Sequence, residues 1–310
     1  MAAKELWVEA YRPTTLDGYV FRDSHQKQMI EKWISDGSIP HVLLSGSSGI
    51  GKTTLAKILI NKLDIHQFDV LEINASRTNS VDDVRNKIIN FIEKIPFGAF
   101  KVVLLDEADY LSHSAQAALR GILEEYHEYA RFILTCNYPN KILPAIHSRC
   151  QGFHIEKVDQ VEFTTRVATI LLTESIQFDL ETLDIFVKAT YPDLRKCINL
   201  VQMNSLAGSL LTPNTGDSND ADYKLEMVQL FKAGKIADAR KLICKQARPD
   251  EIDDIYRWLY SNIDYFGNTV HKQDDAVLII KQGLVDHSLV IDPEINLAAV
   301  LIRLARNLEE

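Results

Sequence analysis

Residues 46–53 read Gly-Ser-Ser-Gly-Ile-Gly-Lys-Thr, which fits the phosphate-binding pattern G-x-x-x-x-G-K-[ST]. The apolar run 41–45 predicts a buried strand before it, and the apolar periodicity of residues 52–63 predicts a helix after it. Glycines allow backbone N–H groups to converge on phosphates, and a helix N-terminus adds positive potential. We therefore expect Lys52 to reach the β- and γ-phosphates of a nucleoside triphosphate and the Thr53 hydroxyl to bind Mg²⁺. The residues predicted to bind the nucleotide here are Gly46, Ser47, Ser48, Gly49, Ile50, Gly51, Lys52, Thr53 and Thr54.

A second chemical element lies at residues 101–109, Lys-Val-Val-Leu-Leu-Asp-Glu-Ala-Asp, where an apolar strand ends in two acids. At the carboxyl end of a strand beside the phosphate loop, Asp106 can hold Mg²⁺ directly or through water. Glu107 can then polarise a water for in-line attack on the γ-phosphate. The two elements together predict hydrolysis of a nucleoside triphosphate, and the pair is more specific than either motif alone.

Two shorter motifs are ambiguous on their own. Asn137, at the polar end of the apolar run 131–137, can hydrogen-bond an attacking water or the γ-phosphate, but Asn at a strand end is commonly a turn former. The tripeptide Ser-Arg-Cys at residues 148–150 has no chemical meaning without further context.

The elements that must position these residues alternate along the first half of the chain. Helical periodicity at 81–94 and 112–126 separates apolar runs typical of buried parallel strands, which predicts a three-layer α/β domain. The predicted strands are 41–45, 69–74, 102–106 and 131–137, with 153–155 as a candidate fifth.

After about residue 156 the strand pattern stops. Helices are expected at 160–175, 180–189 and 193–206, followed by a turn-rich polar linker and further helices. Asp292 followed by Pro293 predicts a helix start. The predicted domains are 1–152 for nucleotide binding, 153–207 as a small helical domain, 208–222 as the linker and 223–310 as a larger helical domain.

Composition limits the class of protein. The chain has 310 residues, 46% of them apolar and 25% charged, which is typical of a soluble globular protein. No apolar run approaches the roughly 18 residues of a membrane span, and the N-terminus has no signal-peptide core. Four dispersed cysteines without a C-x-x-C pair indicate reduced thiols in a cytoplasm rather than a zinc site. The net charge of −9 argues against coating nucleic acid with the whole surface but leaves room for a local basic site.

In this order, the phosphate loop, the Asp-Glu-Ala-Asp box, Thr-Cys-Asn and Ser-Arg-Cys resemble the clamp-loader branch of the AAA+ ATPases. Residues 7–13, Trp-Val-Glu-Ala-Tyr-Arg-Pro, are similar to the Trp-x-Glu-Lys-Tyr-Arg-Pro opening of replication factor C subunits, with Ala10 replacing the lysine. Residues 74–76, 114–120 and 192–195 also match, and the resemblance covers residues 5–207. The patterns at 230–235 and 239–243, and the short C-terminal region, resemble the large clamp-loader subunit of T4-like bacteriophages.

The resemblance implies roles that spacing alone does not give. Asn137 is implied to be the first sensor and Arg195 the second, touching the γ-phosphate, whereas the residues alone favour a solvated arginine at 195. Arg149 is implied to be an arginine finger for the nucleotide of a neighbouring subunit. The remaining implied residues are Tyr11, Arg12 and Pro13 for adenine, Gln116 and Arg120 for coupling, and Arg77 and Arg85 for DNA phosphates. Without the resemblance, Gln116 and Arg120 are interpreted as solvated residues on a helix face, and a solvated surface arginine explains Arg77 and Arg85 at least as well.

The implied architecture is an AAA+ P-loop core with a parallel sheet, a small helical lid and an all-helical collar. The implied activity is ATP hydrolysis with Mg²⁺ by a subunit that opens a sliding clamp and places it on primer-template DNA. Expected partners are the clamp, the DNA, copies of the chain itself and a smaller clamp-loader subunit, in the cytoplasm of a bacterial host if the chain is phage-encoded.

Two alternatives stay open from the sequence. A related AAA+ DNA motor such as a branch-migration helicase shares the ATPase motifs, although the Tyr-Arg-Pro opening and Ser-Arg-Cys argue against it. A nucleotide-gated scaffold subunit would bind ATP without cleaving it, but such subunits often lack the catalytic acid or lysine, and both Glu107 and Lys52 are present.

Overall fold

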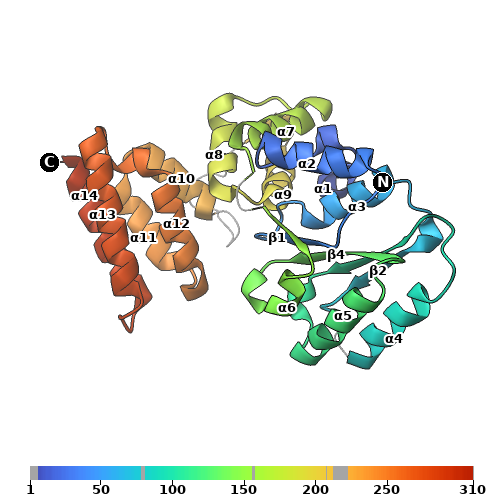
Figure 1. Ribbon diagram of the computed structural model, residues 1–310. Coiled ribbons are helices and arrows are strands. Elements are labelled where there is room, and N and C mark those ends of the chain that lie inside the picture. The colour runs from blue at the N-terminus through green and yellow to red at the C-terminus, as the bar shows by residue number, and fades with distance from the viewer. Residues whose placement is uncertain (1–5, 78–80, 156–157, 207, 212–222, 310) are drawn as a thin grey trace. The chain divides into compact units, whose positions relative to one another are not determined.

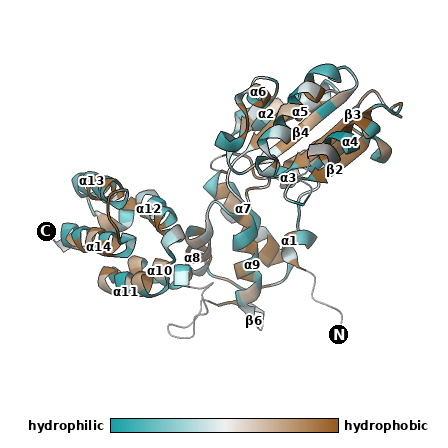
Figure 2. Cartoon of the chain, turned by 90° about the horizontal axis from the view of Figure 1, so that it is seen from below, coloured by the Kyte–Doolittle hydropathy of each residue, from teal (hydrophilic) through white to brown (hydrophobic). Residues whose placement is uncertain are grey.

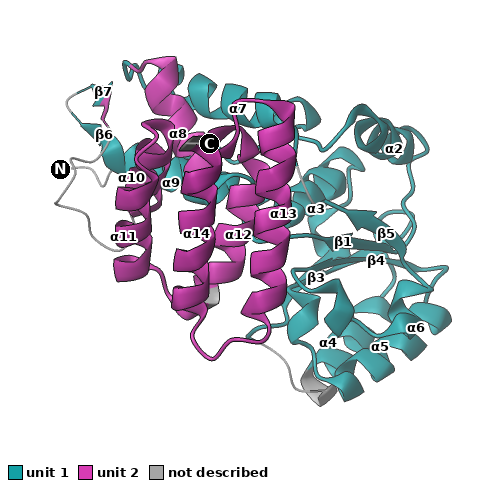
Figure 3. Cartoon of the chain, turned by 90° about the vertical axis from the view of Figure 1, so that its left-hand side faces the viewer, with its two compact units in different colours: residues 1–177, 190–209 teal, residues 178–189, 210–310 magenta. Residues whose placement is uncertain are grey.

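A computed structural model describes residues 6–77, 81–155, 158–206, 208–211 and 223–309. The chain divides into two compact units (Figure 3). Unit 1 comprises residues 1–177 and 190–209, and unit 2 comprises residues 178–189 and 210–310.

Among the described residues of unit 1, five parallel strands form one sheet in the order β2-β3-β4-β1-β5. Each predicted strand is present, with ends shifted by one or two residues, and the α/β class is confirmed. The strands are β1 (Val42–Ser45), β2 (Val70–Asn74), β3 (Lys101–Asp106), β4 (Ala130–Cys136) and β5 (Gln151–His154). Because all five run in the same direction, the polar residues that follow β1, β3 and β4 meet at one edge of the sheet.

Helices cover both faces of this sheet, giving the three predicted layers (Figure 1). Helices α2 (Ser24–Ser35) and α3 (Lys52–Lys62) lie on one face, and α4 (Val81–Ile92), α5 (His113–Glu125) and α6 (Pro144–His147) lie on the other. The strands between them are strongly hydrophobic (Figure 2). Alternate strand side chains pack against α4 and α5, including Leu43, Val103, Leu105, Phe132 and Leu134.

Unit 1 also contains the short helix α1 (Trp7–Ala10), α7 (Gln160–Thr173) and α9 (Leu194–Asn204). Helix α9 ends two residues before the predicted limit, because Ser205–Leu206 (β6) pairs with Ser209–Leu210 (β7) in a small sheet. This sheet takes up the start of the predicted linker, and residues 212–222 of that linker lie outside the described residues.

Unit 2 is built from α8 (Leu180–Thr190) and five later helices. These are α10 (Tyr223–Lys232), α11 (Ile236–Gln246), α12 (Ile252–Ser261), α13 (Val270–His287) and α14 (Pro293–Glu309). The predicted helix start is confirmed, since the Asp292 carboxylate accepts hydrogen bonds from the backbone N–H groups of Glu294 and Ile295 at 3.0 and 3.3 Å. Helix α8 belongs to unit 2 although the sequence grouped it with α7 and α9, so the boundaries of a separate lid domain stay a prediction.

In the described part of the chain, no helix combines the length and apolar character needed to cross a membrane.

Candidate nucleotide-binding and hydrolysis site

The phosphate loop connects β1 to α3, as the sequence predicts. Gly49 and Gly51 have φ angles of 73° and 93°, in the left-handed region that favours glycine. Gly49 also has no room for a side chain, because a Cβ atom there would lie 1.8 Å from Asp193 Oδ1. The backbone of the loop therefore depends on its glycines.

Lys52 begins α3 and folds back over the loop. Its Nζ donates to the carbonyls of Gly46 and Ser47 at 2.9 and 2.6 Å and to Asn137 Oδ1 at 2.8 Å. The side chain is buried, and this desolvation lowers the pKa of Lys52. The structure therefore brings together two predicted site residues, Lys52 at the start of α3 and Asn137 at the end of β4.

Asp106 ends β3 beside Thr53. Its Oδ1 accepts hydrogen bonds from Thr53 Oγ1 at 2.7 Å and from Thr135 Oγ1 at 2.6 Å. A hydroxyl and a carboxylate at this distance are oxygen ligands of the kind that Mg²⁺ takes together with substrate phosphates. The predicted metal-binding pair therefore fits the ion in its donor chemistry.

Glu107 follows Asp106 in a left-handed conformation, with φ 57° and ψ 44°. Such a conformation is uncommon for a residue with a side chain and is frequent at functional sites. The Glu107 N–H donates to Thr135 Oγ1 at 3.0 Å. Thr135 thus fixes the backbone of the predicted catalytic acid and the side chain of the predicted metal ligand.

A second acid supports Asn137. Asp109 Oδ2 accepts from the backbone N–H groups of Asn137 and Tyr138 at 3.3 and 3.2 Å. Asp109 is buried, so this contact holds the end of β4 against the segment that follows β3.

One cavity is lined by most of these groups. It lies wholly within unit 1. Its described lining residues include Ser48, Lys52, Thr53, Asp106, Glu107, Thr135, Asn137 and Arg195.

A second cavity adjoins it and shares Gly49, Gly51 and Thr54 with it. Tyr11, Arg12 and Pro13, the residues expected to contact adenine, line this second cavity. Their segment is attached to the phosphate loop by Arg12 Nε, which donates to Thr54 Oγ1 at 3.2 Å. The predicted base pocket and phosphate pocket are therefore continuous.

Helix α7 also contributes to this second cavity. Arg166 lines it and donates from NH2 to the Tyr11 carbonyl at 2.6 Å. Tyr19 lines it as well, with its ring against Gly51. The Tyr19 hydroxyl is buried and has no hydrogen-bond partner among the described residues, and burial raises its pKa.

Helix α9 brings Arg195 to both cavities from its first turn. Asp193 caps this helix by accepting from the Lys196 N–H at 2.9 Å, and its carboxylate lies against Gly49. Burial raises the pKa of Asp193. The contact fixes the start of the arginine-bearing helix beside the phosphate loop.

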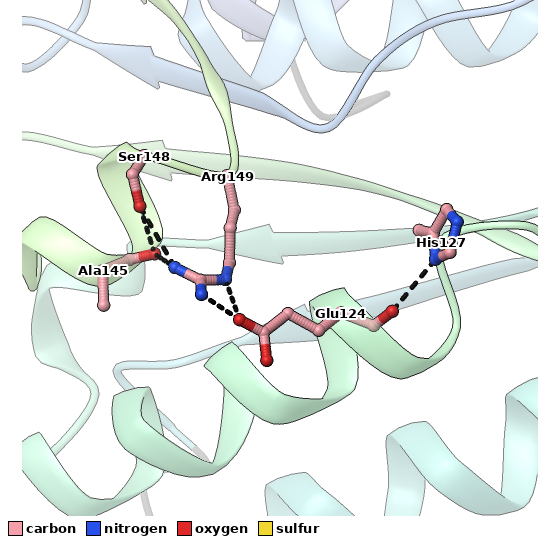
Figure 4. Close-up of polar contacts among 5 residues, drawn as sticks. All are labelled: Glu124, His127, Ala145, Ser148 and Arg149. Atoms are coloured by element: carbon pink, nitrogen blue, oxygen red, sulfur yellow. Dashed lines mark hydrogen bonds and ion pairs between the residues drawn. The ribbon is translucent and has the colours of Figure 1, made fainter.

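Arg149 does not line either cavity within the described part of its own chain. It follows α6, and its guanidinium pairs with Glu124 near the end of α5 (Figure 4). The structure therefore leaves it apart from the phosphate loop of the same chain.

Gln116 is buried, which differs from the solvated residue that its position on a predicted helix suggests. Its Nε2 donates to the carbonyls of Leu111 and Lys141 at 3.2 and 3.0 Å, and its Oε1 accepts from the Leu143 N–H at 2.8 Å. Arg120, one turn further along α5, is exposed. Gln116 thus joins α5 to the segment that leads into α6.

Arg77, after β2, and Arg85, on α4, are both exposed. Neither lines the two cavities within the described residues.

Sequence reasoning missed Thr135, Asp109, Asp193, Tyr19 and Arg166 as site residues. Thr135 and Asp193 stood inside motifs already singled out, and adjacency to Asn137 and Arg195 was the available signal. The contacts of Tyr19 and Arg166 join segments distant in sequence and leave no local pattern.

Comparisons with known proteins show the family of this chain. A model of the AAA family, described as ATPase family associated with various cellular activities, matches residues 42–157. A protein named replication factor C small subunit from Sulfurisphaera tokodaii is 34% identical over 325 residues, covering 97% of this chain and 95% of that protein. The replication factor C small subunit from Sulfolobus acidocaldarius is 33% identical, and the match covers 100% of this chain and 98% of that protein.

Among solved structures, the Thermotoga maritima RuvB Holliday junction branch migration motor matches with a TM-score of 0.56 and 18% identity, covering 80% of each chain. A likeness at this identity shows a shared fold and no more.

Proposed function

This chain belongs to the replication factor C small-subunit family, and we propose that the cavity around residues 46–53 is the site at which it hydrolyses ATP. The chain is an ATP-hydrolysing subunit of a DNA sliding-clamp loader. The observation that carries the site assignment is the meeting of Lys52, Asp106, Glu107 and Asn137 at one edge of the sheet.

Within the chain, each of these residues has a distinct proposed role. Lys52 binds the β- and γ-phosphates, exchanging some of its loop contacts for them. Glu107 polarises the attacking water, and Asn137 orients that water or the γ-phosphate. Thr53 and Asp106 would hold Mg²⁺, which neutralises charge on the phosphates when bound.

We propose that Tyr11, Arg12 and Pro13 receive the adenine in the second cavity. Its continuity with the phosphate loop through Gly49, Gly51 and Thr54 supports this assignment. Arg195 lines both cavities and is our proposed sensor of the γ-phosphate.

Arg149 is proposed to act on the nucleotide of a neighbouring copy. Its absence from the described lining of its own cavities supports a role outside its own site. A positive charge supplied across the interface stabilises charge that develops on the transferred phosphoryl group.

Gln116 and Arg120 are proposed to couple the site to assembly. The buried hydrogen bonds of Gln116 support this for one of the two, since they connect α5 to the segment that carries Arg149. Arg77 and Arg85 are proposed to bind DNA phosphates, a use that their exposure permits and that needs no base-specific contacts.

Unit 2 is proposed to form the oligomeric collar with copies of the chain and a smaller clamp-loader subunit. Exposed apolar residues at helical spacing on α13 and α14 support an interface there; they are Leu278, Val285, Ile295 and Ile302. The T4-like bacteriophage origin and a bacterial cytoplasm stay predictions, because the relatives named above come from archaeal organisms.

The helicase alternative has only the fold likeness to RuvB in its favour, at 18% identity, against relatives of 33–34% over nearly the whole chain. The scaffold alternative conflicts with the presence of both Lys52 and Glu107 in the cavity.

The test of the assignment is steady-state ATP hydrolysis by the assembled loader with clamp and primer-template DNA. Glu107→Gln removes the charge that polarises the water, so we expect the rate to fall at least about 100-fold while ATP binding persists. Glu128→Gln, an exposed acid outside the cavity, is the matched control and should keep the rate. An unchanged rate in Glu107→Gln would refute the hydrolytic assignment.

A further inference from the structure

Arg149 makes four hydrogen bonds within its own chain. Its Nε donates to Glu124 Oε1 at 2.7 Å, and its NH2 donates to the same oxygen (Figure 4). Its NH1 donates to the Ala145 carbonyl at 2.7 Å and to Ser148 Oγ at 3.1 Å. Three different acceptors thus fix the plane of the guanidinium.

Both ends of this contact are anchored in the core of unit 1. Ile122 and Leu123 precede Glu124, and Ile146 and Cys150 flank Arg149; all four are buried in one hydrophobic cluster. The last turn of α5 is closed by His127, whose Nδ1 lies 2.9 Å from the Glu124 carbonyl (Figure 4). The distance between the two backbones is therefore set by packing that does not depend on the ion pair.

The pair itself is too exposed to matter much for folding. The side chains of Arg149 and Glu124 keep 30% and 47% of their accessible surface. Ion pairs at such sites contribute little to stability, because water screens them and ordering two long side chains opposes them. Donation of two guanidinium N–H groups to one carboxylate oxygen does, however, restrict the orientation of an arginine.

We propose that Glu124 is the positioning residue of Arg149, holding the guanidinium in the orientation that meets a neighbour's γ-phosphate. The inference rests on the trans role of Arg149 under the proposed function. Glu124 touches no reacting atom in this account and acts only through Arg149. Glu124 contributes preorganisation: because it already fixes the guanidinium of Arg149, no entropy is lost in ordering that group during catalysis.

The test compares kcat and KM for ATP in assembled loaders with clamp and DNA. Glu124→Ala is expected to lower kcat by about tenfold with KM unchanged, because the P-loop of each chain is untouched. Glu124→Gln keeps an acceptor oxygen and should recover part of the loss. Glu128→Ala, an exposed acid with no ion pair among the described residues, is the control and should match wild type.

A double variant separates positioning from general damage. If Glu124 acts through Arg149, Arg149→Ala with Glu124→Ala should be no slower than Arg149→Ala alone. A wild-type or higher kcat in Glu124→Ala, or losses that multiply in the double variant, would overturn the positioning role alone. A wild-type rate in Arg149→Ala would overturn the trans role and this inference together.

Discussion

The contact between Gly49 and Asp193 shows how closely the phosphate loop is fitted to α9. Gly49→Ala would require a φ of 73° that alanine rarely adopts and would place its Cβ 1.8 Å from the Asp193 carboxylate. The left-handed conformation alone costs roughly 1–2 kcal/mol, so we expect ATP affinity to fall by at least about tenfold, measured with a fluorescent nucleotide. Gly152→Ala is the control, because nothing lies within 4 Å of its added Cβ; equal affinities for the two variants would contradict the fitted loop.

His41, just before β1, makes stability depend on pH. Burial lowers its pKa from 6.5 to about 4, and its Nδ1 accepts the Phe132 N–H at 3.2 Å, which requires an unprotonated nitrogen. Below pH 6.5, His41 is protonated in the unfolded chain but stays neutral in the folded chain until about pH 4. The free energy of unfolding therefore decreases as the pH falls from about 6.5 to 4. From pH 7 to 5 this amounts to at most about 2 kcal/mol.

The measurement is the free energy of unfolding in urea at pH 7 and pH 5. Wild type should lose more stability over this step than His41→Gln, whose side chain does not titrate. The same loss in both proteins would show that His41 does not cause the dependence.

At the scale of single residues, the sequence predicted the site residues that belong to recognisable motifs. Lys52, Asp106 and Asn137 meet because each follows or ends a strand of one parallel sheet, and that arrangement can be read from the chain. Thr135 and Asp193 stand two residues before Asn137 and Arg195, but what they contact is set only by the fold, so their roles were not predicted.

At the scale of elements, Gly283 allows α13 and α14 to pack closely. A Cβ there would lie 2.4 Å from Val300 Cγ2 and 3.1 Å from Tyr256 Cε1. In a helix interior Gly→Ala ordinarily stabilises by about 1 kcal/mol, but here overpacking should reverse the sign and destabilise by about 1–3 kcal/mol.

Gly121 in α5 gives the matched comparison, since nothing lies within 4 Å of its added Cβ. Thermal unfolding should therefore show a lower midpoint for Gly283→Ala and a raised or equal midpoint for Gly121→Ala. A raised midpoint of thermal unfolding in both variants would mean that α13 and α14 can move apart without loss of stability.

The sequence predicted most element positions, because apolar periodicity is a local property of strands and helices. It missed the pairing of β6 with β7, since two-residue strands leave no periodic pattern. It also grouped α8 with α7 and α9 by proximity along the chain, whereas its packing places it in unit 2.

At the scale of the whole molecule, we propose that one chain supplies parts of two different ATPase sites. Its P-loop, Asp106 and Glu107 surround one cavity, while Arg149 is held by Glu124 outside that cavity. Catalysis would then depend on assembly, because the arginine of each chain would serve the nucleotide of a neighbour. The net charge of −9 fits such an arrangement, in which a few exposed arginines per chain would bind DNA only collectively.

The most direct measurement mixes two variants that are each inactive for a different reason. Glu107→Gln lacks the group that polarises water but keeps Arg149, and Arg149→Ala lacks the arginine but keeps Glu107. Where an Arg149→Ala chain receives the arginine of a Glu107→Gln neighbour, a complete site forms. We predict that co-assembled loaders recover clamp- and DNA-stimulated ATP hydrolysis that neither variant shows alone; a mixture as inactive as its two components would contradict a site shared between neighbouring chains.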